Sequence, residues 1–224
     1  MGDPDADLSG CDRDELREWF MDADGDGFGD PGTTMLQCGQ PDGFVENSEV
    51  CDDTTAEAKP GGTELLCDGL DNDCDTNTPE QCATGCDPFR SSEGIYALCV
   101  VATTHAVAKS ACESMDMDLA QIDSSAENTV LRSEMTTRMG GAQFFVGGQD
   151  LVEHVWRWPD GTQFWVGAAG GMAVNGQFAT WTAGEPNNAN GNEDCMEVFG
   201  DGRWNDVPCT DVRAFACERA SATP

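Results

Sequence analysis

Apolar residues in the second half of the chain fall into short segments whose spacing predicts both strands and helices. Residues 95–101 are apolar enough for a strand, and residues 104–115 carry apolar side chains at helical spacing. We therefore expect a strand followed by a helix. The buried face of that helix is expected to carry Ala106, Val107, Ala111 and Met115.

A second helix is predicted to begin just after Ser124. Ser124 and Glu127 stand three residues apart, as in a capping box, in which each side chain satisfies a free backbone N–H at the start of a helix. We expect this helix to bury Val130, Leu131 and Met135.

Two more strands are predicted at 144–148 and 155–158, with a turn at 159–161. A glycine-rich stretch at 166–177 looks like an insertion before a long polar loop. Two helices followed by short strands and a long loop predict a mixed α+β domain.

The charge distribution divides the chain near Gly85. Residues 1–85 hold 23 acidic and three basic residues, whereas 86–224 hold 19 acidic and eight basic residues. Each part has six of the twelve cysteines. We expect an acidic, disulfide-rich module at 1–85, a second domain at 86–219 and a short polar tail at 220–224.

The net charge of -31 argues against nucleic acid and anionic membranes as partners, because both would repel the chain. No apolar run approaches the roughly 18 residues needed to span a bilayer. No nucleophile elbow, P-loop or zinc motif is present, so we do not expect an enzyme. His105 and His154 are expected to be ordinary surface or helix histidines.

Twelve cysteines, without histidines at zinc-ligand spacing, predict six disulfides and an oxidising compartment. Residues 1–5 contain no apolar core of a signal peptide. We interpret Met1 as an added start on a secreted chain whose leader was removed, and expect an extracellular or cell-surface location.

The long polar loop and the segment after it carry a dense set of oxygen donors. Three carboxylates and two carboxamides lie within about two dozen residues, and such a set suits Ca²⁺, which takes six to eight oxygen ligands. These donors are Glu185, Asn187, Glu193, Asn205 and Asp206.

The triplet Glu185-Pro186-Asn187, the run Glu193-Asp194-Cys195 and the segment Trp204-Asn205-Asp206 resemble the calcium site of C-type lectins. The resemblance extends from Cys86 to Cys217 and implies the C-type lectin fold. It also implies that the five donors bind one Ca²⁺ and that two adjacent sugar hydroxyls bind to this ion and its ligands. The implied disulfides are Cys86–Cys99, Cys112–Cys217 and Cys195–Cys209.

The order Glu185 before Asn187 is the one that the family associates with mannose, glucose, N-acetylglucosamine and fucose-type sugars. The resemblance further implies a cis peptide bond at Pro186 and an inward-facing Trp204. A lectin-like fold that contacts protein instead of sugar is the alternative reading. A calcium-stabilised extracellular adhesin without sugar binding is a second alternative.

An auxiliary Ca²⁺ is also implied close to the first. Its ligands in the resemblance would be Asp150, Glu153, Asn188, Glu193 and Asp194. The alternative for Asp150 and Glu153 is that they are ordinary solvent-exposed acids of a loop.

The first 85 residues contain a loop similar to that of an EF-hand. Acids alternate over Asp22, Asp24 and Asp26, and Gly27 takes the sixth position, but Thr33 stands at the twelfth in place of a bidentate Glu. The loop is therefore an incomplete EF-hand. The acids that we expect to bind metal in this module are Asp22, Asp24, Asp26, Asp30, Asp52, Asp53, Asp68, Asp71, Asp73 and Asp75.

The pattern from Trp19 to Asp75 resembles the MopE-like metal-binding motif of secreted bacterial proteins. That family is associated with copper, but 1–85 contains no histidine, and the remaining oxygen donors suit Ca²⁺. Asp-Gly turns that only reverse the chain are the alternative. Among fifteen possible connectivities for six cysteines, we expect Cys38–Cys51, Cys67–Cys74 and Cys11–Cys82.

Taken as a whole, the sequence predicts a calcium-dependent lectin with an added metal-binding module. A single shallow sugar site binds weakly, so multivalent display or self-association would be needed for useful avidity.

Overall fold

The computed structural model describes residues 16–219, which form two compact units. One unit comprises residues up to Leu65 together with Leu70–Glu80, and the other comprises Leu66–Gly69 with the chain from Gln81 onward. Within residues 16–219 no helix has the length and apolarity needed to cross a membrane.

The first unit is built around a small antiparallel sheet in the order β2-β1-β3. Its strands are β1 (Arg17–Met21), β2 (Asp30–Gln37) and β3 (Phe44–Val45). Trp19 on β1 is buried, and its indole N–H donates to the Gln37 carbonyl at 2.9 Å. Apart from this sheet, the described residues of the unit form loops, which accounts for the small number of buried side chains among them.

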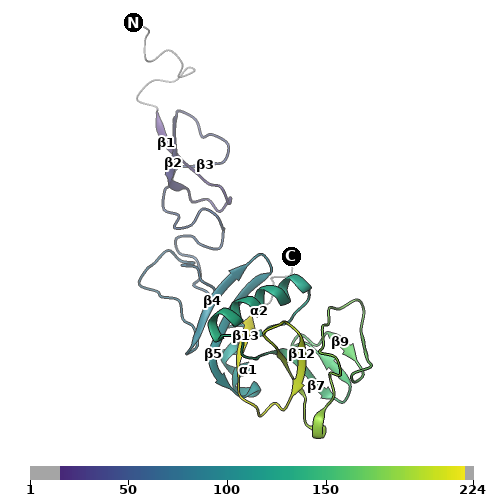
Figure 1. Cartoon of the computed structure of the whole chain (residues 1–224). Helices are drawn as coiled ribbons and strands as arrows, with labels where there is room; N and C mark the ends of the chain where they lie inside the picture. The colour runs from purple at the N-terminus through teal and green to yellow at the C-terminus, as the bar shows by residue number, and fades with distance from the viewer. Residues whose placement is uncertain (1–15, 220–224) are drawn as a thin grey trace. The chain divides into compact units, whose positions relative to one another are not determined.

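The second unit has a mixed sheet and two α-helices among its described residues (Figure 1). The main path of the sheet runs β10-β9-β8-β7-β13-β5-β4, with β11 joining β7 and β12, and β6 joining β13. The helices are α1 (His105–Glu113) and α2 (Ser125–Met139), and a 3₁₀ turn covers Ala189–Gly191. The strands are β4 (Cys86–Ser91), β5 (Gly94–Thr103), β6 (Asp118–Leu119), β7 (Phe144–Val152), β8 (Val155–Arg157), β9 (Gln163–Val166), β10 (Met172–Ala173), β11 (Cys195–Val198), β12 (Trp204–Val207) and β13 (Arg213–Glu218).

Helix α2 follows the capping-box prediction. The Ser124 hydroxyl accepts from the Glu127 amide at 3.0 Å, and the Glu127 carboxylate accepts from the Asp123 amide at 2.7 Å. The helix ends at Gly140, whose φ of 68° places it in the left-handed region that favours glycine. Leu131 and Met135 are fully buried as expected.

The expected buried face of α1 is correct for Met115 and wrong for Ala106 and Val107, which are exposed. The helix buries His105, Ala108 and Cys112, and Ala111 is partly buried. The reason is that Cys112 is bonded to Cys217 on β13, and this bond turns its own helical face toward the sheet. The glycine-rich stretch at 166–177 contributes the edge hairpin of β9 and β10.

The lectin-like unit contains the three disulfides that the resemblance implies: Cys86–Cys99, Cys112–Cys217 and Cys195–Cys209. The three other expected pairs are wrong. The structure joins Cys51 to Cys74 and Cys67 to Cys82, and Cys38 is also disulfide-bonded. The expected pairs Cys38–Cys51, Cys67–Cys74 and Cys11–Cys82 are therefore excluded, and Cys11 lies outside the described residues.

The 64–75 loop shows why the expected disulfide pairing of this module fails. The Glu64 carboxylate accepts from the amides of Asn72 and Asp73 at 2.9 and 3.3 Å, which folds the 64–75 loop back on itself. Cys74, in this loop, lies 5.6 Å from Cys51, measured between Cα atoms, although the two are 23 residues apart, and pairing by short spacing alone cannot anticipate this bond.

The main core is rich in aromatic side chains, and one of them is hydrogen-bonded to the buried side-chain amide of Asn128. Trp204 is fully buried, as the resemblance implies, and its indole N–H donates to Asn128 Oδ1 at 2.9 Å. The Asn128 Nδ2 group donates to the Gly202 carbonyl at 2.9 Å. Asn128 thus ties α2 to β12, the strand that carries two of the expected calcium ligands.

One buried and one partly buried acid, Glu127 and Glu218, lie near the start of α2. The Tyr96 hydroxyl donates to Glu127 at 2.7 Å, and the Glu218 carboxylate accepts from the Gln121 amide at 2.9 Å. Burial raises the pKa of Glu218 to about 8, with a further contribution from the Glu127 charge. Burial also raises the pKa of Glu127.

Replacing Asn128 with Ala is expected to lower the free energy of unfolding by about 2–4 kcal/mol, because two buried partners lose their hydrogen bonds. Urea unfolding followed by tryptophan fluorescence measures the change. Ser133→Ala, at an exposed position of the same helix, is the control and should change stability by less than about 0.5 kcal/mol. Equal effects of the two substitutions would contradict the role given to Asn128.

The free energy of unfolding in EDTA should fall as pH rises from about 4.5 to about 8. The folded state holds a proton on Glu218 that the unfolded chain releases near the ordinary pKa, so the contribution is present below that value and is lost through this window. Glu218→Gln should flatten the dependence by about 1–3 kcal/mol over the window. A parent and a variant with parallel pH profiles would show that the raised pKa is wrong.

Candidate functional site

The long loop before β11 is held to β12 by one buried carboxylate. Asp206 is only 1% exposed and accepts from the backbone amides of Asn187 and Asn188 at 3.1 and 2.6 Å. Its neighbour Trp204 faces the core, so the alternation of the strand turns Asp206 to the same side, and the Asp206 carboxylate reaches the loop. The Glu185–Pro186 bond is cis, as the resemblance implies.

Glu185 has a carboxylate oxygen that is buried and has no hydrogen-bond partner. Burial raises its pKa, and the adjacent Asp206 carboxylate and the charge of Glu193 add to the shift. Burial also raises the pKa of Glu193, whose carboxylate accepts from the Ala189 amide at 2.7 Å. Three acids thus repel one another around one end of the loop, an arrangement that a cation would stabilise.

The two carboxamides of the expected set lie at the same end of the domain. Asn205 Nδ2 donates to Glu197 Oε1 at 3.1 Å, which leaves Asn205 Oδ1 available as an acceptor. Glu197 is buried and is also paired with Arg213. Sequence reasoning missed Glu197 as the residue that orients Asn205. The sequence offered one indication of this role, because Glu197 is an acid within an otherwise apolar strand, Cys195–Val198.

The expected auxiliary set is linked by direct contacts. Asn188 Nδ2 donates to both Glu153 oxygens at 2.8 and 3.0 Å, and Asn188 Oδ1 accepts from the Glu193 amide at 3.0 Å. Burial raises the pKa of Asp194, with added repulsion from Asp150 and Glu153. The structure therefore brings all five members to neighbouring positions.

Two local features of this second group could not be read from the sequence. Asp150 is 5% exposed and accepts from the amides of His154 and Val155 at 2.8 and 3.1 Å, so it shapes the turn between β7 and β8. His154 Nδ1 lies 3.3 Å from Glu153, with its backbone at a φ of 67°. Possible ligand atoms of Asp150, Glu153 and His154 lie within 4.8 Å of one another.

Among residues 16–219 there are four groups of acids, cysteines or histidines in which each residue offers one possible ligand atom within 4.8 Å of those of the others. Glu185, Glu193 and Asp206 are not one of these groups. The three acids therefore do not all offer an oxygen within 4.8 Å of one another, although their charges repel one another.

The sequence profile of the family described as "Lectin C-type domain" matches residues 101–219, which is more than half of the chain. The chain belongs to this family. Its α+β architecture, with two helices and disulfides linking the strands and the long loop, is the C-type lectin fold. The family consists of non-enzymatic, lectin-like domains, which agrees with the expectation that this domain is not an enzyme.

Several curated lectins resemble the C-type lectin domain of this chain. Hepatic lectin of Gallus gallus is 36% identical over 113 residues, covering 50% of this chain and 48% of the relative. Ladderlectin of Oncorhynchus mykiss is 32% identical over 133 residues, covering 58% and 63%. The chain therefore spans about half to two thirds of the length of these relatives.

Solved structures also match. The carbohydrate-recognition domain of the mouse scavenger receptor C-type lectin is 26% identical with a TM-score of 0.49, and the match covers 64% of this chain and all of that domain. The cow C-type carbohydrate-recognition domain of CD23, solved in the presence of an oligosaccharide, is 25% identical with the same TM-score, covering 64% and 98%.

In the other unit, the 22–30 loop turns its acids inward. Asp22 accepts from the amides of Gly25, Asp26 and Gly27, and its ligand atoms lie within 4.8 Å of those of Asp24 and Asp53. One oxygen each of Asp24 and Asp26 is buried without a partner. Burial raises the pKa of Asp24, partly offset by a hydrogen bond from the Asp26 amide.

A second acidic group joins Glu64, Asp71 and Asp73 within 4.8 Å. One oxygen each of Glu64 and Asp71 is buried and unpartnered. Glu64 was absent from the expected set, because it stands outside the Asp-rich runs and reaches the group only through the fold of its loop. The family described as "Putative metal-binding motif" matches residues 51–80, which contain this group.

Four of the expected metal-binding acids have other partners. Asp30 accepts from Gly32 and Thr33, Asp52 from Thr54, and Asp75 from Asn77. Asp68, whose side chain is fully buried, pairs with Arg90 at 3.0 Å. The pairing with Arg90 neutralises Asp68, whereas Asp30, Asp52 and Asp75 keep oxygen lone pairs that could still bind a cation, so the expected set stays a prediction.

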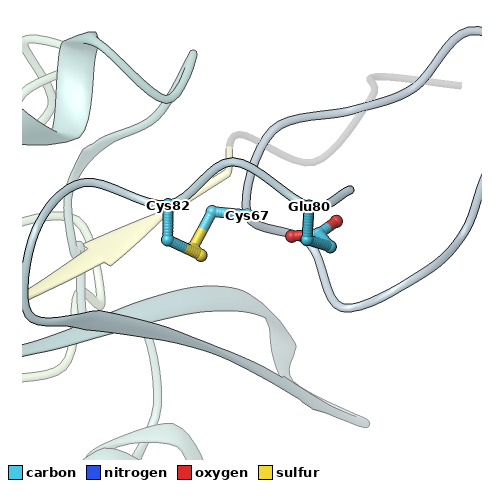
Figure 2. Close-up of side chains that lie close together, drawn as sticks. All are labelled: Cys67, Glu80 and Cys82. Atoms are coloured by element: carbon cyan, nitrogen blue, oxygen red, sulfur yellow. A yellow bond between two sulfur atoms is a disulfide. The ribbon is translucent and has the colours of Figure 1, made fainter. Parts of the chain in front are cut away.

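Cys67 and Cys82 of the second unit are joined by a disulfide, drawn in Figure 2 as a yellow bond. A disulfide offers no thiolate, so these two cysteines are not metal ligands. In the described part of the first unit, the groups around Asp22 and around Glu64 contain oxygen donors only.

Adding EDTA to the full chain should raise amide hydrogen exchange in peptides covering 22–30 and 64–75, because the repelling carboxylates lose their counter-ion. Exchange followed by mass spectrometry measures this, and the Cys51–Cys74 disulfide should keep the change local. Asp53→Asn should reduce the EDTA effect at 22–30, whereas the control Asp52→Asn should not. Identical exchange with and without EDTA would mean that these acids form only a solvated surface.

Proposed function

We propose that this protein is a calcium-dependent lectin that binds carbohydrate at the end of its long loop. The observation that carries the proposal is the buried, unpartnered oxygen of Glu185 beside the Asp206 carboxylate. An ionised carboxylate in that position needs a positive partner, and no basic residue contacts Glu185 among the described residues.

Calcium fits the residues that are present. Glu185, Asn187, Glu193, Asn205 and Asp206 offer carboxylate and amide oxygens, with neither sulfur nor imidazole in the set. Such a hard, oxygen-only set favours Ca²⁺ over transition metals. Relatives in the family typically bind Ca²⁺, which supports the same assignment.

The ion would supply a positive centre to which two vicinal sugar hydroxyls bind. The residues around it would then fix the orientation of the sugar: a carboxylate accepts a hydrogen bond from a hydroxyl, and an Asn NH₂ group donates one. The order Glu185 before Asn187 favours mannose, glucose or fucose-type ligands over galactose-type ligands, by the family resemblance.

The second group, Asp150, Glu153, Asn188, Glu193 and Asp194, is proposed as an auxiliary calcium site. Its contacts join the β7–β8 turn to the long loop through Asn188. An ion there would hold the loop in place while the first site binds sugar, which is a positioning role.

We further propose that 1–85 is a calcium-stabilised module, that 86–219 is the carbohydrate-recognition domain and that 220–224 is a tail. A secreted or cell-surface location fits the disulfides. Multivalent display would compensate for the weak affinity of a single shallow site.

Binding to mannose-type sugars should require Ca²⁺, and Glu185→Gln with Asn187→Asp should shift preference toward galactose or reduce mannose binding at least about tenfold. Glycan-array binding with Ca²⁺ and with EDTA measures both effects. Asn190→Asp, an exposed substitution in the same loop, is the control and should bind like the parent.

A double variant that binds mannose like the parent would show that the assigned site is wrong. A parent chain that binds no glycan in Ca²⁺ would favour the adhesin or protein-binding alternative.

A further inference from the structure

A cavity of about 320 Å³ opens in the lectin domain beside the β7–β8 hairpin. This volume falls in the range of pockets that hold small molecules. Its walls come from α1, β6, β7, β8 and the turn after β8. None of the residues that line it belongs to either proposed calcium set.

The walls are largely apolar and include four aliphatic side chains, Leu119, Leu151, Val152 and Val155. Leu119 is buried at the base, while Leu151 and Val152 on the hairpin are 78% and 65% exposed. Exposed apolar side chains around an apolar hollow lose contact with water when a hydrocarbon fills it, at about 25 cal/mol for each Å² buried. The lining therefore favours a ligand with an aliphatic body.

The charge of the lining is opposite to that of the protein. Lys109 and Arg157 line the cavity and no acid does so among residues 16–219, in a chain with 42 acidic and 11 basic residues. Lys109 is already paired with Glu113 at 2.6 Å and lies 3.5 Å from Asp118. Its charge is therefore largely compensated.

Arg157 is the cation that remains available. It is exposed, and its Nη1 donates to the Gly161 carbonyl at 2.8 Å, which anchors the guanidinium at the cavity. Its other N–H groups have no partner among the described residues. A guanidinium fixed in this way matches the two oxygens of a carboxylate.

His105 adds no positive charge at neutral pH. Its ring is buried, lies 3.3 Å from the Val146 carbonyl and contacts Phe145 edge to face. Burial lowers the pKa of His105 to about 4, so the ring is neutral and contributes an uncharged wall.

From the aliphatic walls and the free guanidinium we propose that this cavity binds a medium-chain fatty acid, with its chain against Leu119 and Val155 and its carboxylate on Arg157. This site is separate from the proposed sugar site and needs no calcium.

Isothermal titration calorimetry of the full chain with decanoate tests the proposal, in EDTA and near 150 mM salt to limit long-range repulsion. Decanoate is expected to saturate at one site and to bind at least about tenfold more tightly than decyltrimethylammonium, which has the same chain and the opposite charge. Arg157→Gln should weaken decanoate binding about five- to tenfold. Arg203→Gln, which removes an exposed arginine that does not line the cavity, is the matched control and should stay within about twofold.

Leu151→Asp provides a second variant that leaves the core intact, because this side chain is mostly exposed. It adds a negative charge and removes apolar surface, so decanoate binding should be lost. Failure of the parent to bind decanoate, equal binding of the cation, or an unchanged affinity in both Arg157→Gln and Leu151→Asp would overturn the proposal. Because the titration is made in EDTA, its outcome is independent of calcium-dependent sugar binding.

Discussion

Repulsion between neighbouring carboxylates is the constraint on which the loops of this protein depend. Acids face one another around Asp22, around Glu64 and at Glu185 and Asp206, and in each place at least one carboxylate oxygen is buried without a partner. Few bases are near enough to compensate for these charges. Cations bound among the acids would remove the repulsion and order the loops, so ion binding and loop structure are two aspects of one equilibrium.

In the lectin domain, the strands beneath the long loop are held by the core and by a disulfide, independently of any ion in the loop. Trp204, Asn128 and the aromatic core fix β12, and β12 presents Asp206 to the long loop. The Cys195–Cys209 disulfide bridges β11 and the segment just after β12, the strand that carries Asn205 and Asp206. These strands would therefore stay in place if the proposed ion left the loop.

The β7–β8 hairpin carries two different chemistries. Asp150 and Glu153 belong to the acidic group near the long loop, while Leu151, Val152 and Val155 line the aliphatic cavity. The register between β7 and β8 is irregular between Gln149 and Val152, and the same short hairpin carries residues of a polar site and of an apolar one. The oxygen-rich group suits a hard cation, and the apolar group suits hydrocarbon.

The sequence alone determined those features that depend on local pattern. The capping box predicted α2, the donor triplets predicted the residues that gather at the loop end, and the family resemblance implied the three lectin disulfides. The tertiary structure decided those features that depend on contacts between residues far apart in the sequence. It turned α1 so that Ala108 and Cys112 are buried in place of Val107, paired Cys51 with Cys74, and brought Glu64 to Asp71. It also placed Asp68 in an ion pair with Arg90. It assembled the cavity from four separate elements and a turn. These outcomes arise from contacts between residues distant in the chain, and local spacing carries no information about such contacts.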